Sequence, residues 1–196
     1  MNAIEAILTR RSTRRFLARP IEQEKLEQVI EAGRHAPSGG NSQTTRFIVI
    51  RDRDTLDALA ALARTEFAAM EIRPDTYKSL KNSILASRKG DYVFHYNAPA
   101  LIVTANKKGY GNAIADCACA LENMMLAANA LDLGSCWINQ LRWLADVPTV
   151  EDAMRRLGMA ADEWVCGALA LGYPDTPDGL PARTPLPHPG NPVVWH

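Results

Sequence analysis

Residues 112–133 read NAIADCACALENMMLAANALDL, and Ala, Leu, Met and Cys occupy nearly every face of the helix that this composition predicts. A helix that is apolar on all sides is buried on all sides. In a protein of 196 residues, this indicates a central helix that a second subunit also covers. Gly134 is expected to cap the helix, since glycine is common just after a helix ends.

Apolar runs of strand length lie on both sides of this helix. Pro99–Thr104 precedes it, Ser135–Ile138 follows it, and Phe47–Ile50 and Val165–Leu171 are two further candidate strands. The remaining periodic segments predict helices around Ile4–Leu8, from Pro20 to Arg34, from Asp52 to Phe67, from Tyr77 to Arg88, and from Thr149, as its cap, to Gly158.

We interpret residues 1–196 as one domain, which is the usual organisation at this length. The span 66–96 has the weakest pattern and is read as a variable excursion. The tail 174–196 is rich in proline and has no apolar period. Because such a tail cannot build its own core, we expect it to lie across another surface.

Composition excludes several classes of function. The 22 basic and 22 acidic residues cancel, which argues against a general nucleic-acid or anionic-membrane role. No apolar run is long enough to span a membrane, and the N-terminus lacks a signal-peptide pattern. The cysteines, in apolar runs without a C-x-x-C pair, are read as reduced, buried thiols of a cytoplasmic protein: Cys117, Cys119, Cys136 and Cys166.

Residues 10–16 read RRSTRRF and concentrate four arginines and two hydroxyls. Guanidinium groups are always charged and can bind two phosphate oxygens at once. The cluster therefore predicts a phosphate site. The alternative is a solvated basic face that complements the dipole at the end of a helix.

Two other segments carry candidate binding residues. Residues 36–43 read APSGGNSQ, which is either a ligand-binding loop or a simple turn between a helix and a strand. Residues 133–140 read LGSCWINQ, where Trp137 could be only a core aromatic residue. By contrast, Gly109-Tyr110-Gly111 is not a dinucleotide-binding fingerprint, and the histidines show no metal-ligand spacing.

In this order, the three segments resemble the nitroreductase family of flavoenzymes, and the resemblance spans nearly the whole chain. It implies an α+β fold, an α-β-α sandwich with a mostly antiparallel central sheet. It also implies an intertwined homodimer with FMN at the interface. The tail 174–196 would be an arm on the partner subunit, with residues 193–195 as a candidate edge strand.

The resemblance also implies ligand positions. Arg10, Arg11, Ser12 and Arg14 would contact the FMN phosphate and ribityl chain, whereas Arg15 falls on a variable, exposed position. Thr44 and Thr45 replace a Pro-Trp pair that is usual in the family. The other implied contacts are Pro37, Ser38, Gly39 and Asn41 from the neighbouring subunit, Trp137, Ile138, Asn139 and Gln140 beside the ring near N5, and Arg183 at the phosphate.

The implied activity is that of an FMN-dependent oxidoreductase. NADH or NADPH would pass hydride to flavin N5, and a nitroaromatic, quinone or enone would then be reduced, in a ping-pong mechanism. Residues 66–96 would select the acceptor. No catalytic side chain and no metal site is predicted. The alternatives are a flavoenzyme of the same fold with other chemistry, such as dehalogenation, flavin cleavage or dehydrogenation, and a non-catalytic FMN-binding protein.

Overall fold

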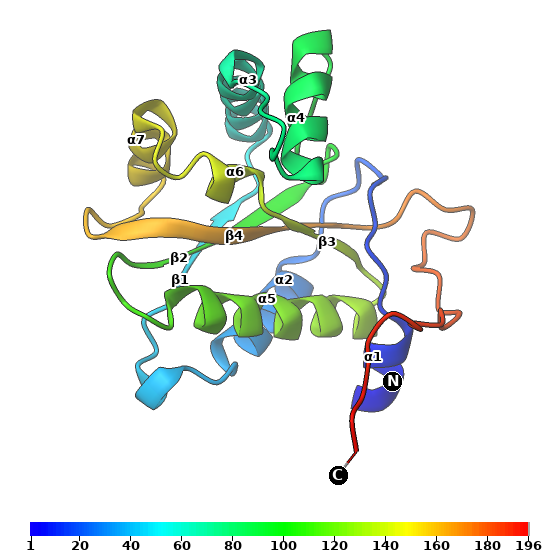
Figure 1. Ribbon diagram of the computed structural model, residues 1–196. Coiled ribbons are helices and arrows are strands. Elements are labelled where there is room, and N and C mark those ends of the chain that lie inside the picture. The colour runs from blue at the N-terminus through cyan, green and yellow to red at the C-terminus, as the bar shows by residue number, and fades with distance from the viewer. Residues whose placement is uncertain (196) are drawn as a thin grey trace.

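A computed structural model describes residues 1–195, which form three layers around one β-sheet (Figure 1). The sheet has the order β1-β2-β4-β3, and each neighbouring pair is antiparallel. This confirms the predicted α+β class. The strands are β1 (Arg46–Ile50), β2 (Ala100–Lys107), β3 (Gly134–Ile138) and β4 (Glu163–Gly172).

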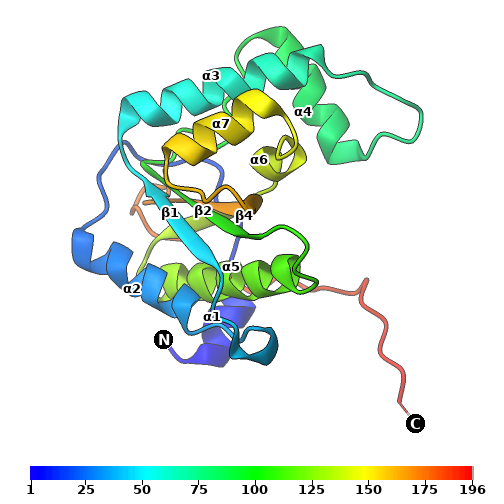
Figure 2. The ribbon, with the colours of Figure 1, turned by 90° about the vertical axis from the view of Figure 1, so that its left-hand side faces the viewer.

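Helices cover both faces of the sheet (Figures 1 and 2). One face carries α3 (Arg53–Ala69), α4 (Lys78–Lys89), α6 (Gln140–Trp143) and α7 (Pro148–Arg156). The other face carries α1 (Ala3–Thr9), α2 (Gln23–Arg34) and α5 (Ala113–Ala130), with a short 3-10 turn at Gly39–Asn41. None of the described helices is long and apolar enough to cross a membrane.

The central strands are apolar without alternation because both of their faces are buried. In β2, Leu101 and Val103 join a core with Phe67 beneath α3 and α4. Ile102 points to the other face and joins a second core with Met124 of α5. The two cores hold the sheet rigidly between the helical layers.

The helix α5 is buried along one side only. Met124 and Leu121 are fully buried, whereas Ile114 is 37% exposed and Ala115 and Cys119 are also exposed. The prediction was that a second subunit covers part of this helix, and one chain alone leaves that part exposed. Of the four thiols, Cys119 is exposed in this chain, contrary to the expectation that all are buried. The uncovered strip is apolar and is available to a second molecule.

Two predicted helix caps are also wrong. Gly134 is the first residue of β3, and Asp132 takes the left-handed position after α5, with φ 64°. A Cβ atom at Gly134 would lie 2.6 Å from Thr13 Oγ1, so close packing explains this glycine. Before α7, Val147 and not Thr149 is the N-cap, because Pro148 takes the first helical position.

The tail leaves the body of the molecule. Phe16 pairs with Pro174, and from there the chain runs past α1 and away from the domain (Figure 2). Its apolar residues are exposed, with Val194 at 75% and Trp195 at 89%. Residues 193–195 form no strand within this chain.

Candidate functional site

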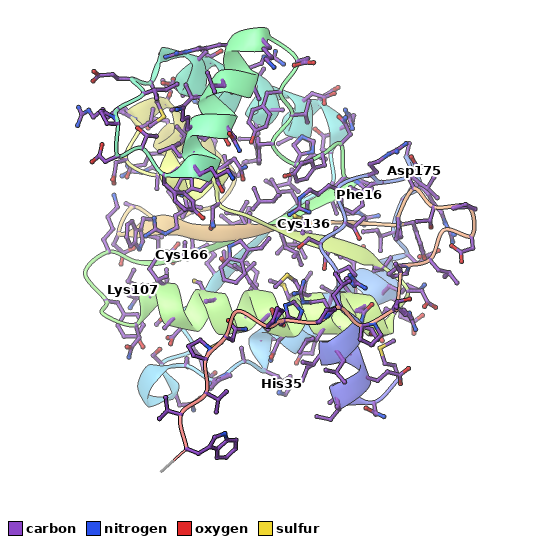
Figure 3. The ribbon with its side chains drawn as sticks, turned by 45° about the vertical axis from the view of Figure 1, so that its right-hand side comes forward. Phe16, His35, Lys107, Cys136, Cys166 and Asp175 are labelled. Atoms are coloured by element: carbon purple, nitrogen blue, oxygen red, sulfur yellow. The ribbon has the colours of Figure 1, made fainter. Side chains whose placement is uncertain are left out.

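The arginine segment, residues 10–17, lies along the edge of the sheet beside β3 and the end of β4. Thr13 N donates to Ser135 O at 2.8 Å, and Leu17 N donates to Tyr173 O at 2.9 Å. Figure 3 shows Phe16 of this segment next to Asp175 at this end of the sheet, with Cys136 on β3. The backbone of the arginine segment is thus fixed, and its side chains are presented from a rigid edge.

The arginines differ in what they bind within the chain. Arg15 is 83% exposed and pairs with Asp175 at 3.2 Å, as its variable position predicted. Arg10 makes only a 3.6 Å ion pair with Glu122. Arg11 donates to the Thr184 carbonyl through Nη2, but its Nε is buried and has no partner among residues 1–195.

A buried N–H without a partner is costly, and an anion oxygen would satisfy it. Arg14 lines an open hollow of about 370 Å³ beside Tyr96 and Asn97. Arg11 does not line this hollow, whose lining also includes Asp91 and Asp175. The segment therefore offers an unsatisfied guanidinium donor at Arg11 and a positive charge beside open space at Arg14. These features fit the phosphate end of a flavin nucleotide.

Cys136 on β3 ties the arginines to the strand. Burial raises the pKa of the Cys136 thiol, while the charges of Arg14 and Arg10 and a hydrogen bond with Ser12 act in the opposite direction. These side chains therefore surround a residue one position before Trp137. The structure brings the arginine segment and residues 137–140 together at one edge of the sheet.

The four predicted ring contacts at residues 137–140 are not equivalent. Ile138 is 1% exposed and belongs to the core, so only its backbone can face a ligand. Trp137 Nε1 donates to Asn139 Oδ1 at 2.9 Å, and Gln140 Nε2 donates to Tyr92 OH at 2.8 Å. The side-chain amides of Asn139 and Gln140 are half-buried and provide polar groups near the end of β3.

The loop at residues 37–43 lies at the opposite end of α5 from the arginine segment. Gly39 N donates to Asp116 Oδ1 at 3.0 Å, and Tyr110 OH donates to Asp116 Oδ2 at 3.0 Å. Gln43 N donates to Ser38 Oγ at 3.1 Å. Several polar groups of the loop are thus already used within the chain.

The glycine of this loop has a structural reason. A Cβ atom at Gly39 would lie 2.1 Å from Asn112 Nδ2 and 2.7 Å from Tyr110 OH. Asn41 is exposed and has φ 55°, a left-handed conformation that asparagine tolerates. The turn interpretation therefore explains Gly39 without a ligand, while Pro37 and Asn41 remain exposed for one.

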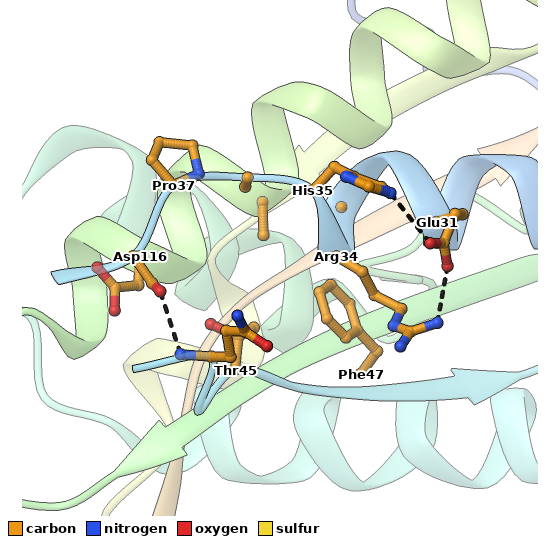
Figure 4. Close-up of a pocket in the computed structure, with 12 residues that line it drawn as sticks. Glu31, Arg34, His35, Pro37, Thr45, Phe47 and Asp116 are labelled. Carbon is orange, nitrogen blue, oxygen red and sulfur yellow. Dashed lines mark hydrogen bonds and ion pairs between the residues drawn. The ribbon is translucent and has the colours of Figure 1, made fainter. Parts of the chain in front are cut away.

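Beside the loop lies a hollow of about 350 Å³ between α2 and α5 (Figure 4). Two side chains that line this hollow contact the Glu31 carboxylate, Arg34 through Nη1 at 2.7 Å and His35 through Nε2 at 3.2 Å. The lining includes Pro37, Ser38, Gln43, Thr45, Phe47 and Asp116. Within one chain this hollow does not meet the arginine segment.

Sequence reasoning missed Asp116, Tyr110 and Tyr92. Asp116 and Tyr110 anchor the loop, and Tyr92 contacts Gln140 from the excursion 66–96. A buried acid in the first turn of an apolar helix was the available indication for Asp116. Nothing local marks the two tyrosines.

Arg183 reaches α5 and not open space. Its Nη2 donates to Asn129 O at 2.9 Å and also pairs with the carboxylate of Asp132. The next residue, Thr184, accepts from Arg11. The structure thus places Arg183 beside the arginine segment, with its guanidinium engaged by an acid.

Comparisons with known proteins agree with this geometry. The Nitroreductase family model matches residues 7–173. The crystal structure of a nitroreductase with bound FMN from Bacteroides fragilis covers 100% of both chains, with a TM-score of 0.86 and 32% identity.

Two sequence relatives point the same way. A protein of Archaeoglobus fulgidus is 30% identical over 179 residues, covering 87% of this chain and 84% of that protein; the name proposed for it is NADH dehydrogenase/NAD(P)H nitroreductase. The NADPH-flavin oxidoreductase of Vibrio harveyi is 25% identical over 184 residues, covering 94% of this chain and 70% of that protein. This chain belongs to the nitroreductase family.

Proposed function

We propose that this protein is an FMN-dependent oxidoreductase that uses NADH or NADPH to reduce a small oxidised acceptor. The observation that carries the proposal is the arginine segment at the edge of β3, where Arg10 and Arg14 lie near Cys136 and the buried Nε of Arg11 lacks a partner within residues 1–195. A phosphate provides the acceptor oxygens that this donor set needs. The family relationship, with FMN bound in a similar structure, supports FMN as the source of this phosphate.

The chain's own residues bind and orient the cofactor. Arg10, Arg11, Ser12 and Arg14 hold the phosphate and ribityl chain, and Arg183 adds positive charge beside them. Residues 137–140 border the ring at its N5 side. When bound, FMN supplies the capacity to take electrons from a nicotinamide and pass them to an acceptor.

The second half of each site comes from a partner copy of the chain. The uncovered strip of α5 offers apolar surface for a homodimer, and residues 184–195 of the tail are exposed and leave the domain as an arm would. In such a dimer, Pro37, Ser38, Gly39 and Asn41 approach the flavin of the neighbouring subunit. This arrangement explains why the loop and the arginine segment lie at opposite ends of α5 in one chain.

The order of events is ping-pong, because the nicotinamide and the acceptor use the same face of the site in turn. The acceptor is a nitroaromatic, a quinone or an enone, selected by the excursion 66–96 that lies next to Gln140. The protein contributes placement and polarity and no side-chain acid or base. Its unpaired thiols suit the cytoplasm.

The test uses purified protein and FMN. We expect FMN to bind the apoprotein tightly and its visible absorbance to bleach when NADH or NADPH is added without oxygen. Addition of a quinone or nitroaromatic should then restore the absorbance. Bound FMN that neither dinucleotide reduces would support the non-catalytic alternative, and a protein that does not bind FMN would overturn the proposal.

A further inference from the structure

His95 is a fully buried histidine at the end of the excursion 66–96 that no part of the proposed cofactor site uses. Its ring packs edge-on against Phe94, with ring centroids 5.2 Å apart. Its Nε2 lies 3.3 Å from the carbonyl oxygen of Leu56 in α3. Because a carbonyl can only accept, Nε2 carries the ring proton and Nδ1 is left as an acceptor. Nδ1 is buried and has no partner among residues 1–195.

His95 is also the first residue of a strained turn. Ala98 N donates to His95 O at 3.0 Å. The two residues between them, Tyr96 and Asn97, are left-handed, with φ angles of 56° and 57°. Asparagine tolerates this conformation, but it is uncommon for a residue as bulky as tyrosine. Strained residues persist where their surroundings fix them, and they cluster at functional sites.

Two contacts with α3 fix this turn. One is the contact of His95 Nε2 with Leu56 O, and the other is the hydrogen bond from Arg53 Nη2 to Asn97 Oδ1, at 3.1 Å. The turn also borders open space, because Tyr96 and Asn97 line the hollow of about 370 Å³ that Arg14 lines. A ligand that Arg14 binds in this hollow therefore lies against the turn.

We propose that His95 is a positioning residue of the cofactor site: its neutral ring holds the strained turn against α3, so that Tyr96 and Asn97 form a wall beside Arg14. His95 does not touch the cofactor and acts through the two residues that follow it. The inference rests on the proposed function, which places FMN at Arg14.

Only the neutral ring suits this position. Protonation would add an N–H at Nδ1, for which the described residues provide no acceptor, and a buried donor without a partner is costly. The charged groups that act on the ring are Arg53 and Asp57 of α3, which pair with each other at 2.8 Å. Within the turn, Tyr96 is the one further titratable residue. Burial therefore lowers the pKa of His95.

The lowered pKa sets the direction of a pH effect. The turn is held fully above the ordinary histidine pKa of 6.5, and it loses stability as the pH falls below that value, because the released ring binds a proton and the buried ring does not. Acid therefore favours an open turn and removes the wall beside Arg14.

Hydrogen exchange of the Ala98 N–H, followed by NMR on the apoprotein, measures this opening directly. Corrected for the intrinsic exchange rate, the opening constant should rise about tenfold between about pH 7.5 and about pH 5.5, as one group with a pKa of about 6.5 allows. His95→Gln keeps an amide donor for Leu56 O but does not titrate, so its opening constant should not change with pH. A constant that is independent of pH in the wild type, or an equal rise in His95→Gln, would overturn the role of His95.

Two controls accompany the pH series. His35→Gln should keep the wild-type pH dependence, because the side chain of His35 is 77% exposed and lies outside the turn. The Gly90 N–H, which donates to Ser87 O at 3.0 Å, is the control amide, and its opening should not follow the turn. If His95→Gln folds poorly, the wild-type series and the FMN measurement below still decide the question.

The second measurement adds FMN at about pH 7.5 to about 100 times its dissociation constant, which is determined by quenching of flavin fluorescence. Exchange of the Ala98 N–H should slow at least about tenfold, because binding that requires the closed turn opposes its opening, while exchange of the Gly90 N–H stays the same. FMN that binds without slowing the Ala98 N–H leaves the proposed function standing and removes the turn from the site. An apoprotein that binds no FMN overturns both proposals.

Discussion

The arginine segment and the loop at residues 37–43 are the two predicted halves of the site, and they differ in what their polar groups already bind. The arginine segment presents donors that the chain leaves partly unsatisfied, with the buried Nε of Arg11 as the clearest case. The loop has its polar groups bonded to Asp116, Tyr110 and its own backbone. One half supplies charge, and the other supplies shape.

Arg14→Glu should cause the largest effect, because it puts negative charge where the first half must bind a phosphate. We expect the affinity for FMN to fall by at least about tenfold, as the loss of a charged hydrogen bond predicts. Titration of the apoprotein with FMN measures it. Arg15→Glu is the control, since Arg15 is 83% exposed and pairs with Asp175. Equal losses in the two variants would mean that the segment attracts FMN only through its overall charge.

Asp116→Ala should act on the second half by removing the carboxylate that anchors its loop. Gly39 N loses its acceptor and Tyr110 OH loses one of its acceptors, so we expect a loss of about 1–3 kcal/mol in the free energy of unfolding. FMN affinity should fall less than in Arg14→Glu. Urea denaturation measures the free energy of unfolding. Tyr110→Phe keeps the hydrogen bond from Gly39 N to Asp116 and should therefore show a smaller loss. A fully stable Asp116→Ala protein would show that the loop does not depend on this anchor.

The dependence of FMN affinity on salt concentration distinguishes the contribution of charge from that of loop shape. Raising the ionic strength from about 0.05 M to about 0.5 M shortens the range of electrostatic attraction and should weaken FMN binding by the wild-type protein. Arg14→Gln should make this dependence shallower, whereas Tyr110→Phe, which removes a hydrogen bond of the loop but no charge, should leave it unchanged. The affinity series in KCl gives both slopes. A change of slope in Tyr110→Phe would contradict this division between charge and shape.

Arg183→Ala should have the smallest effect. Its guanidinium is engaged by Asp132, and partly exposed pairs contribute about 0–1 kcal/mol. FMN affinity should therefore fall less than about fivefold. Asp132→Asn offers the sharper variant, because it releases Arg183 toward the arginine segment and should strengthen FMN binding. If Asp132→Asn weakens binding, Arg183 depends on that acid for its position.

The comparison also shows how far the sequence could be interpreted. The four strands and the main helices follow from apolar periodicity, because both faces of the sheet are buried. The predicted caps at Gly134 and Thr149 were wrong. Gly134 begins β3 and is a glycine because Thr13 packs against it, and Pro148, before Thr149, is the first residue of α7.

The contacts that build the site were beyond a local pattern. Gly39 and Asp116 are 77 positions apart, and Tyr92 and Gln140 are 48 apart. Apolar periodicity predicts which face of a helix or strand is buried, but it does not identify the distant residues that contact that face. The arginine cluster alone predicted a phosphate site but left a solvated basic face as the alternative, and the family motif favoured the phosphate. The strip of α5 that includes Cys119 is uncovered in one chain, and composition suggested a second chain there.

The most direct test of the central claim is subunit complementation. Arg14→Glu disables the arginine segment, and Gly39→Val disables the loop, because its side chain would clash with Asn112 and Tyr110. If each site joins the arginine segment of one subunit to the loop of its partner, a mixed dimer of the two variants contains one site with both halves intact. Unfolding and refolding an equal mixture should therefore restore tight FMN binding at about a quarter of all sites, as random pairing predicts. A mixture that binds FMN no better than the separate variants would contradict the account, because both halves would then belong to one chain.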